Sequence, residues 1–315
     1  MAHDTLYAIG EALIDMIPSK TGCSFAEVPS FSPRVGGAPA NVAVAAARLG
    51  ASAAFVGKVG TDGFGDSLVS TLERSGVDAS CVRRSERATT LAAVTLSSAG
   101  ERSFRFFRGA DQDLAPEEVP EDLLACSRFL HFGSVSLTPG LSRSATIFAA
   151  RHARQQGALV SYDPNYRPAL WESEEQAVQW MRLPLPLVDI LKLAEEELPL
   201  VSGFEGLEEG TARLAEGGVR LVLVTLGERG VFYRWAGRTG LVPGISVQVA
   251  DTNGAGDTFL GAVLSRLSRR GSAPLEGLTQ CELEEILNFA NRAAAITCSR
   301  SGAIPAMPTL TEVEG

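Results

Sequence analysis

Asp251-Thr252-Asn253-Gly254-Ala255-Gly256-Asp257 leads into an apolar run that predicts a helix from Thr258. Gly254-Ala255-Gly256 carries little or no side chain, so several backbone N–H groups can converge on one anion at the positive end of that helix. Asp257 lies in the first turn, where a carboxylate can accept the proton of a hydroxyl that attacks a phosphoryl group. The stretch therefore predicts a phosphate cradle with a base beside it.

The same residues have a plainer interpretation, in which Asp257 stabilises the helix N-terminus and the glycines form a tight turn. Two other phosphate-binding loops are excluded. The dinucleotide fingerprint needs a third glycine where Phe259 stands. The P-loop needs Gly-Lys-Ser/Thr, and none of the three lysines, Lys20, Lys58 and Lys192, stands in that tripeptide.

Composition limits the classes of protein and partner. A chain of 315 residues, 45% of them hydrophobic, can bury a large core, which fits one α/β domain over residues 1–315. The net charge of −9 argues against broad contact with nucleic acid or with an anionic membrane, so we expect a small-molecule partner. Five scattered cysteines without a Cys-x-x-Cys pair, and a start without a signal-peptide pattern, predict a cytoplasmic location.

Carboxylates and glycines follow the first predicted strand. Residues 6–10 predict a buried strand that leads to Glu11 and Asp15, two carboxylates in an apolar setting. Asp15 either caps a turn, pairs with an arginine or binds ligand hydroxyls. The stretch Gly36-Gly37-Ala38-Pro39-Ala40-Asn41 then enters a predicted helix. Adjacent glycines let the backbone approach a ligand, and Asn41 either caps the helix or directs its amide into the same pocket.

Two further stretches predict a second, smaller sheet. Residues 15–35 are rich in turns with short extended pieces, and residues 89–110 alternate as a hairpin. Together they are expected to form a lid over one end of the main sheet. Phe104 either packs in the lid or in a dimer interface, or it contacts the ligand. Strand alternation is expected to put Arg105 and Arg108 on the face opposite Phe104.

Strands and helices alternate over the remainder of the chain. This pattern predicts a mostly parallel sheet with helices on both faces and ligands at the carboxyl ends of the strands. Several polar residues and a glycine directly follow these predicted strands: Asp163, Asn165, Arg167, Glu197, Thr225 and Gly227. Their shared position at the ends of strands supports a ligand site there more strongly than any one residue does. Glu197 belongs to an acidic run that also suits a helix N-terminus.

With these pieces assembled, the chain resembles the ribokinase (PfkB-type) family of carbohydrate kinases from Ile9 to about Thr309. The resemblance rests on two signatures, Gly36-Gly37-Ala38-Pro39-Ala40-Asn41 and the stretch from Asp251 to Asp257. It implies a ribokinase-like three-layer α/β/α sandwich with a mostly parallel central sheet and a small β-sheet lid. It also implies transfer of the γ-phosphoryl group of ATP to a primary sugar hydroxyl.

The resemblance further implies roles for single residues. Asp257 is the expected base, and the backbone of Gly254, Ala255, Gly256 and Asp257 is the expected anion hole. The sugar is expected at Asp15, Gly36, Gly37, Asn41, Phe104 and Arg167. The nucleotide is expected at Asn165, Lys192, Thr225, Gly227, Gly230, Gly254, Gly256, Asn288 and Asn291.

Two ions are implied as well. Glu197 is expected to hold Mg²⁺ through water, although Ala194 stands where the family often has an asparagine. A nucleotide brings most ligands of that ion itself, so the magnesium dependence is expected to remain. The backbone around Asp251, Asn253 and Gly302 resembles loops that bind a monovalent cation, usually K⁺.

Within the family, Gly10-Glu11-Ala12-Leu13-Ile14-Asp15 and the stretch from Asp163 to Trp171 resemble bacterial and plant fructokinases. The alternative is a 2-keto-3-deoxygluconate kinase, because Arg167 can meet a sugar carboxylate as well as a nucleotide phosphate. A third hypothesis is a sugar-binding regulatory protein on the same fold, against which the retention of Asp257 speaks. The expected assembly is a homodimer through the lid.

Overall fold

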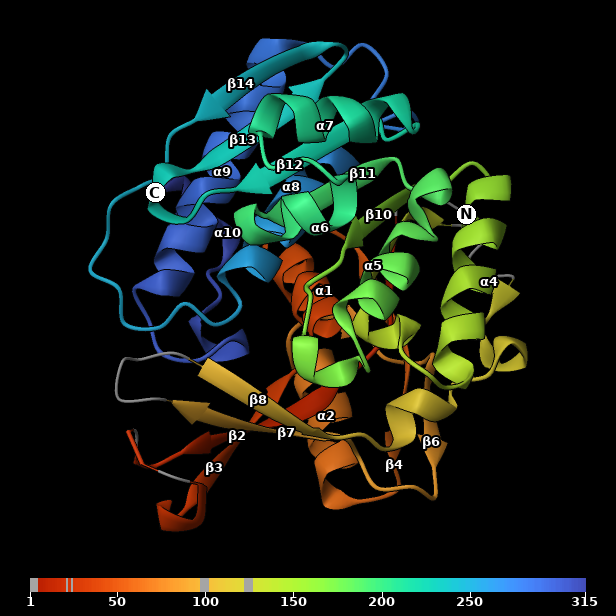
Figure 1. Ribbon diagram of the computed structural model, residues 1–315, viewed down its shortest axis with the longest axis vertical. Helices are drawn as coiled ribbons and strands as arrows, with labels where there is room; N and C mark the ends of the chain where they lie inside the picture. Colours follow the sequence, from red (N-terminus) through yellow and green to blue (C-terminus); the bar gives the residue numbers. More distant parts are fainter. Residues whose placement is uncertain (1–4, 21, 24, 97–101, 122–126) are drawn as a thin grey trace.

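Two sheets organise the chain (Figure 1). The computed structural model describes residues 5–20, 22–23, 25–96, 102–121 and 127–315, with only the backbone of 94–96 and 102–104. The large sheet contains β1 (Thr5–Ile9), β4 (Ala53–Gly60), β5 (Val77–Asp78), β6 (Val82–Ser85), β9 (Ser127–Gly133), β10 (Leu159–Asp163), β11 (Ile190–Ala194), β12 (Leu221–Thr225), β13 (Val231–Trp235) and β14 (Arg238–Val242).

The strand order explains where ligands can bind. The strands are ordered β14-β13-β12-β11-β10-β9-β1-β4-β5, with β6 paired to β4. They run parallel except at one edge, where β13 is antiparallel to β12 and β14 to β13. The carboxyl ends of β1, β9, β10, β11 and β12 therefore meet along one edge of the sheet. Ligands of open α/β sheets bind along this edge.

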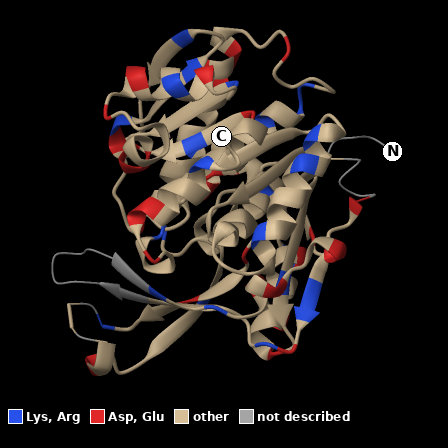
Figure 2. Cartoon of the chain, turned by 45° about the vertical axis from the view of Figure 1, so that its right-hand side comes forward, with Lys and Arg blue, Asp and Glu red and all other residues tan. Residues whose placement is uncertain are grey.

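Helices cover both faces of the large sheet. One face carries α1 (Ala38–Arg48), α2 (Gly63–Arg74), α8 (Ala255–Ser268) and α9 (Gln280–Cys298), with α10 (Leu310–Glu314) against α9. The other carries α4 (Leu141–Gln155), α6 (Leu198–Ser202) and α7 (Leu207–Glu216), with α5 (Glu174–Arg182) against α6. No helix in the described ranges is long and apolar enough to cross a membrane. Acidic and basic residues are interspersed over the helices in Figure 2.

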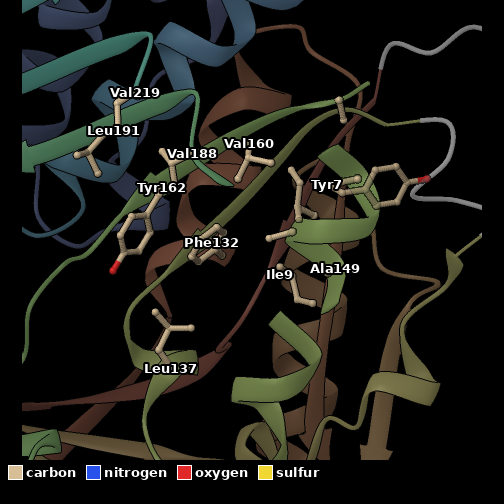
Figure 3. Packing of buried hydrophobic residues seen from close by; sticks show 14 of the residues in the cluster. Tyr7, Ile9, Phe132, Leu137, Ala149, Val160, Tyr162, Val188, Leu191 and Val219 are labelled. Carbon is tan, nitrogen blue, oxygen red and sulfur yellow. The ribbon is translucent and has the colours of Figure 1, made fainter. Parts of the chain in front are cut away.

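The core follows the two-residue period of the strands. Tyr7 and Ile9 of β1 pack with Ala149 of α4 in one hydrophobic cluster, which also contains Phe132 and Tyr162 (Figure 3). The rings of Phe132 and Tyr162 stack with centroids 4.7 Å apart. The alternate residues of β1, Leu6 and Ala8, belong to clusters on the opposite face. The central strand is thus buried on both faces, as expected for a parallel sheet.

The second sheet has four strands in the order β3-β2-β7-β8. Its strands are β2 (Leu13–Pro18), β3 (Phe31–Gly36), β7 (Leu91–Leu96) and β8 (Arg102–Phe107). It lies below the main body in Figure 1, and β8 contacts the short helix η5 (Pro168–Leu170) that follows β10. The expected small sheet is confirmed, and we call it the lid.

Candidate active site

Two pockets meet at the start of α8. Ala255 and Gly256 line the larger pocket, a cavity of about 290 Å³, on one side of the turn that precedes the helix. Asn253 and Asp257 line the smaller pocket on the other side. The smaller pocket also receives side chains from the lid, so it lies between the lid and the carboxyl edge of the large sheet.

The turn at residues 251–256 builds a site for an anion. Gly254 is the N-cap residue of α8, with a φ of 76° and no side-chain cap hydrogen bond. A Cβ atom on Gly254 would lie 3.0 Å from the Cβ of Ala303, and one on Gly256 would lie 3.0 Å from the Nζ of Lys192. No side chain caps the helix terminus here, and the N–H of Ala255 donates to the carbonyl oxygen of Thr252 over 3.3 Å. The N–H groups of Gly256 and Asp257, in the first turn, are the ones that an anion can use.

Asp257 and Asn41 face each other across the two signature stretches. The Nδ2 of Asn41 donates to the Oδ2 of Asp257 over 2.8 Å, although the residues are 216 positions apart. Asn41 therefore does not cap α1, whose N-cap residue is Gly37. Burial raises the pKa of Asp257 to about 6, against the lowering effect of the Asn41 hydrogen bond. A carboxyl group with this pKa is mostly ionised at neutral pH and basic enough to accept a proton.

A buried cation lies beneath the cradle. Lys192 of β11 pairs with Asp163 over 2.9 Å, and both side chains are buried. Burial lowers the pKa of Lys192, but the carboxylates of Asp163 and Glu197 outweigh that effect, and the pKa lies above its ordinary value. Lys192 is therefore charged directly under Gly256, where a positive charge favours a bound anion.

Several predicted sugar-binding residues converge on the smaller pocket. Asp15, Gly37, Asn41 and Arg167 line it. Gly36 lies beside it, where a Cβ atom would come closer to the Asp15 carboxylate than the sum of their van der Waals radii allows. Gly37 has a φ of 109°, and a Cβ atom there would lie 2.5 Å from the carbonyl oxygen of Glu11. The two glycines thus let the backbone pass close to the Asp15 carboxylate and to the main chain of Glu11.

The lid residues that line the smaller pocket differ in one respect from those expected. Phe106 lines the smaller pocket, while Arg105 is exposed. The side chain of Phe104 lies outside the described residues. The expectation that Arg105 and Arg108 share a face was wrong, because residues three positions apart point to opposite faces of a strand, and because β8 ends at Phe107. Arg108 instead turns into the body of the protein and pairs with Asp111 over 2.6 Å.

The larger pocket collects most of the predicted nucleotide-binding residues: Thr225, Gly227, Gly230, Gly256 and Asn291 line it. Asn288 is exposed and donates to the carbonyl of Glu284, so it is not among the residues that line this pocket. Asn165, also expected near the nucleotide, lines the smaller pocket instead. It adopts a φ of 46° directly after β10.

Two groups of pocket residues were not assigned to the site from the sequence. Gly244, Ile245 and Val247 line the larger pocket from an irregular segment after β14. The Pro243-Gly244 turn signal and the alternation of apolar and polar residues over 245–249 mark this segment, but neither signal indicates a ligand. Glu11 lines the smaller pocket and is only 2% exposed. Its sequence signal was a carboxylate directly after a buried strand.

The two loops expected to hold a monovalent cation are joined by hydrogen bonds to Asp251. Asp251 accepts hydrogen bonds from the backbone N–H groups of Asn253, over 2.9 Å, and Gly302, over 3.0 Å. The carbonyl of Cys298 accepts from the N–H of Asp251, which ties this loop to the end of α9. Glu197 accepts from the N–H groups of Tyr166 and Ala194 over 2.6 and 2.7 Å.

Comparison with known proteins identifies relatives over almost the whole chain. A family model described as pfkB family carbohydrate kinase matches residues 4–310. Fructokinase-1 of Oryza sativa subsp. japonica is 43% identical over 314 residues, which cover 98% of this chain and 96% of the rice protein.

Solved structures agree with this assignment. The structure of fructokinase with bound ATP from Xylella fastidiosa matches with a TM-score of 0.91 at 35% identity, covering 99% of this chain and 97% of that chain. A fructokinase double mutant from Vibrio cholerae O395, bound to fructose, ADP and a potassium ion, matches with a TM-score of 0.88 at 32% identity, covering 99% and 98%. The expected three-layer sandwich with a small lid sheet is confirmed.

Proposed function

The chain belongs to the pfkB family of carbohydrate kinases, and from that membership we propose that it converts D-fructose and ATP to fructose 6-phosphate and ADP. The observation that carries the proposal is that Asp257 lines the smaller pocket while its neighbours Ala255 and Gly256 line the larger one, at the start of α8. An acceptor hydroxyl in the smaller pocket and a γ-phosphate in the larger pocket would meet there.

The transfer needs little covalent chemistry from the protein. The hydroxyl oxygen bonds to the γ-phosphorus, and the bond from that phosphorus to the oxygen bridging the β-phosphate breaks. Asp257 accepts the hydroxyl proton, while Asn41 holds the carboxylate in place. The N–H groups at the start of α8 and the ammonium of Lys192 stabilise the charge on the transferring group.

The charge of the smaller pocket supports a neutral sugar over a sugar acid. Asp15 and Asp257 line the pocket with one cation, Arg167, and Glu11 adds a third acidic side chain that is partly protonated near neutral pH because burial raises its pKa to about 7. A sugar acid such as 2-keto-3-deoxygluconate would bring a further carboxylate to a pocket in which acidic groups already outnumber the cation. The names of the relatives support the same choice, because the rice, Xylella and Vibrio proteins are all called fructokinases.

Both expected ions remain part of the proposal. Each oxygen of Glu197 accepts one backbone hydrogen bond, which leaves lone pairs for water ligands of Mg²⁺. When bound with ATP, Mg²⁺ would neutralise charge on the phosphates. The tied loops at Asp251, Asn253 and Gly302 suit a backbone site for K⁺. A cytoplasmic location is consistent with four free cysteines in the described part of the chain.

The experiment is ADP release with a panel of fructose, ribose, glucose and 2-keto-3-deoxygluconate, with ATP hydrolysis without sugar as the background. We expect the highest kcat/KM for fructose. A tenfold or larger preference for the sugar acid would replace fructose as the substrate. Sugar binding by calorimetry without turnover of any sugar would favour the regulatory, non-catalytic hypothesis.

A further inference from the structure

The smaller pocket contains two buried hydrogen-bond acceptors without a partner. Among the described residues that line it, the Oε2 of Glu11 and the Oδ1 of Asn41 have no hydrogen-bond donor. Glu11 is 2% exposed and Asn41 is 4% exposed, so bulk water does not solvate either atom freely. Buried polar atoms in native proteins are nearly always paired, and an unpaired one in a ligand pocket points to a donor on the ligand.

The carboxylate of Glu11 is fixed by the backbone rather than by an ion pair. Its other oxygen, Oε1, accepts from the N–H of Ala38 over 3.1 Å, at the start of α1. Gly37 packs against the carbonyl of Glu11 so closely that no Cβ atom fits between them. Glu11 follows β1, a strand at the centre of the sheet. Its Oε2 is therefore held on a rigid support.

The charged groups around Glu11 have other partners. Arg108 is a nearby cation whose charge lowers the pKa of Glu11. Its guanidinium donates to Asp111 over 2.6 Å and to the hydroxyl of Thr138 over 2.7 Å. Asp15, Asp257 and Arg167 face the same pocket. Burial raises the pKa of Glu11 to about 7, so near neutral pH the group can accept a hydrogen bond or, when protonated, donate one.

We propose that Glu11 is a substrate-binding residue whose Oε2 pairs with a hydroxyl group of the acceptor sugar. This inference rests on the proposed function and extends it, because it adds to the pocket a contact that selects for a hydroxyl at one position of the ring. An analogue without that hydroxyl leaves the buried oxygen unpaired, which disfavours its binding.

The test combines Glu11→Gln with a series of monodeoxy analogues of fructose. The Gln side chain is isosteric, and the Ala38 N–H fixes its amide orientation, because only the carbonyl oxygen can accept from it. The amide NH₂ then replaces Oε2, and an acceptor is lost. We expect kcat/KM for fructose to fall roughly tenfold, with KM for ATP and the thermal midpoint without sugar nearly unchanged.

The analogue series decides whether the contact is direct. For one monodeoxy analogue, we expect the ratio of wild-type to Glu11→Gln kcat/KM to fall from roughly tenfold to about one, as in a double-mutant cycle. The matched control is Asp189→Asn, a buried carboxylate that accepts from the N–H of Val160 at the opposite end of the sheet. It should leave the ratio unchanged for every sugar.

Three outcomes would overturn the proposal. One is the same ratio for fructose and for every analogue, and another is an unchanged kcat/KM for fructose in Glu11→Gln. The third is that Glu11→Gln also raises KM for ATP and lowers the thermal midpoint without sugar. That result would assign Glu11 a structural role. If the Gln variant does not fold, Glu11→Met, which removes the buried carboxylate, takes its place. Failure of the proposed function is distinct, since the wild-type protein would then not phosphorylate fructose.

Discussion

At the scale of single residues, Asp257 is held between opposing influences on its charge. Burial and the nearby carboxylate of Asp163 favour the protonated form, whereas Asn41, Lys192 and Arg167 favour the ionised form. Burial has the largest effect, so the pKa lies above that of an ordinary aspartate, at about 6. The proposed base consequently titrates near the physiological range rather than far below it.

We predict that this titration appears in the pH dependence of catalysis. A general base acts only when unprotonated, so log kcat/KM should rise with a slope near one below pH 6 and level off above it. Asp257→Asn should lower kcat by roughly 10² to 10⁴-fold while sugar binding stays near normal. Initial rates over pH 4.5–8.5, with calorimetry of sugar binding, measure both. An Asn variant that keeps most of its kcat would show that Asp257 is not the base.

Gly36 offers a test of the sugar pocket that introduces no new polar group. A methyl group at this position would collide with the Asp15 carboxylate. We predict that Gly36→Ala raises KM for the sugar roughly five- to a hundredfold, as for overpacking, with KM for ATP unchanged. Gly63→Ala is the matched control, because a Cβ atom there meets nothing within 4 Å. Equal effects of the two variants on KM for the sugar would contradict the prediction.

The sequence could assign residues within a compact motif to the candidate site, but it could not tell which group each side chain contacts. Asn41 and Asp257 each had a local capping alternative, and only the structure shows that Asn41 bonds Asp257 instead. Asn288 and Asn291 lie three positions apart on α9, and the sequence did not separate the exposed residue from the one in the pocket. Such choices depend on how helices rotate against their neighbours, which a single sequence does not record.

At the scale of elements, the parallel strands were predictable and the antiparallel edge was not. The alternation of strands and helices predicted a mostly parallel sheet, and β9, β10, β11 and β12 do pair in parallel. The hairpin of β13 and β14 was missed because Ala236 and Gly237 form its turn, with φ values of 49° and 76°. A turn with two positive φ values usually carries Asn-Gly or Asp-Gly, so alanine there conceals the signal.

The loop that leads into α8 is the site of the predicted monovalent cation. Asp251 ties its own loop to the turn at Gly302, and the position of Gly254 depends on both. A K⁺ ion bound to this backbone would order the cradle and add positive field beside the phosphates. We predict that kcat rises when K⁺ replaces tetramethylammonium at constant ionic strength. Equal rates in both salts would argue against the cation site.

At the scale of the whole molecule, the lid leaves apolar surface uncovered. Phe107 of β8 is 52% exposed, and Phe25, between β2 and β3, is 49% exposed. Exposed aromatic side chains on a sheet are suited to burial against a symmetric copy. We therefore retain the prediction of a homodimer through the lid.

Light scattering at micromolar concentration measures the assembly directly, and we predict the mass of two chains. Phe107→Lys should shift the mass toward one chain, because a charge in an apolar interface is costly to bury. Leu183→Lys is the matched control, since Leu183 is similarly exposed, at 51%, but follows α5 in the main body. A wild-type protein with the mass of one chain would refute the dimer.

The hydrogen bond between Asn41 and Asp257 also sets an order of events during synthesis. Translation adds roughly 5–20 residues per second, so Asn41 waits about 10–40 s before its partner, 216 positions later, is made. Over that interval α1 lacks α8, the helix whose Gly261 packs against Val42 and Ala45. The growing chain therefore carries an uncovered apolar helix face and an incomplete proposed sugar pocket, and it gains the proposed phosphate cradle only after residues 251–257 have been made.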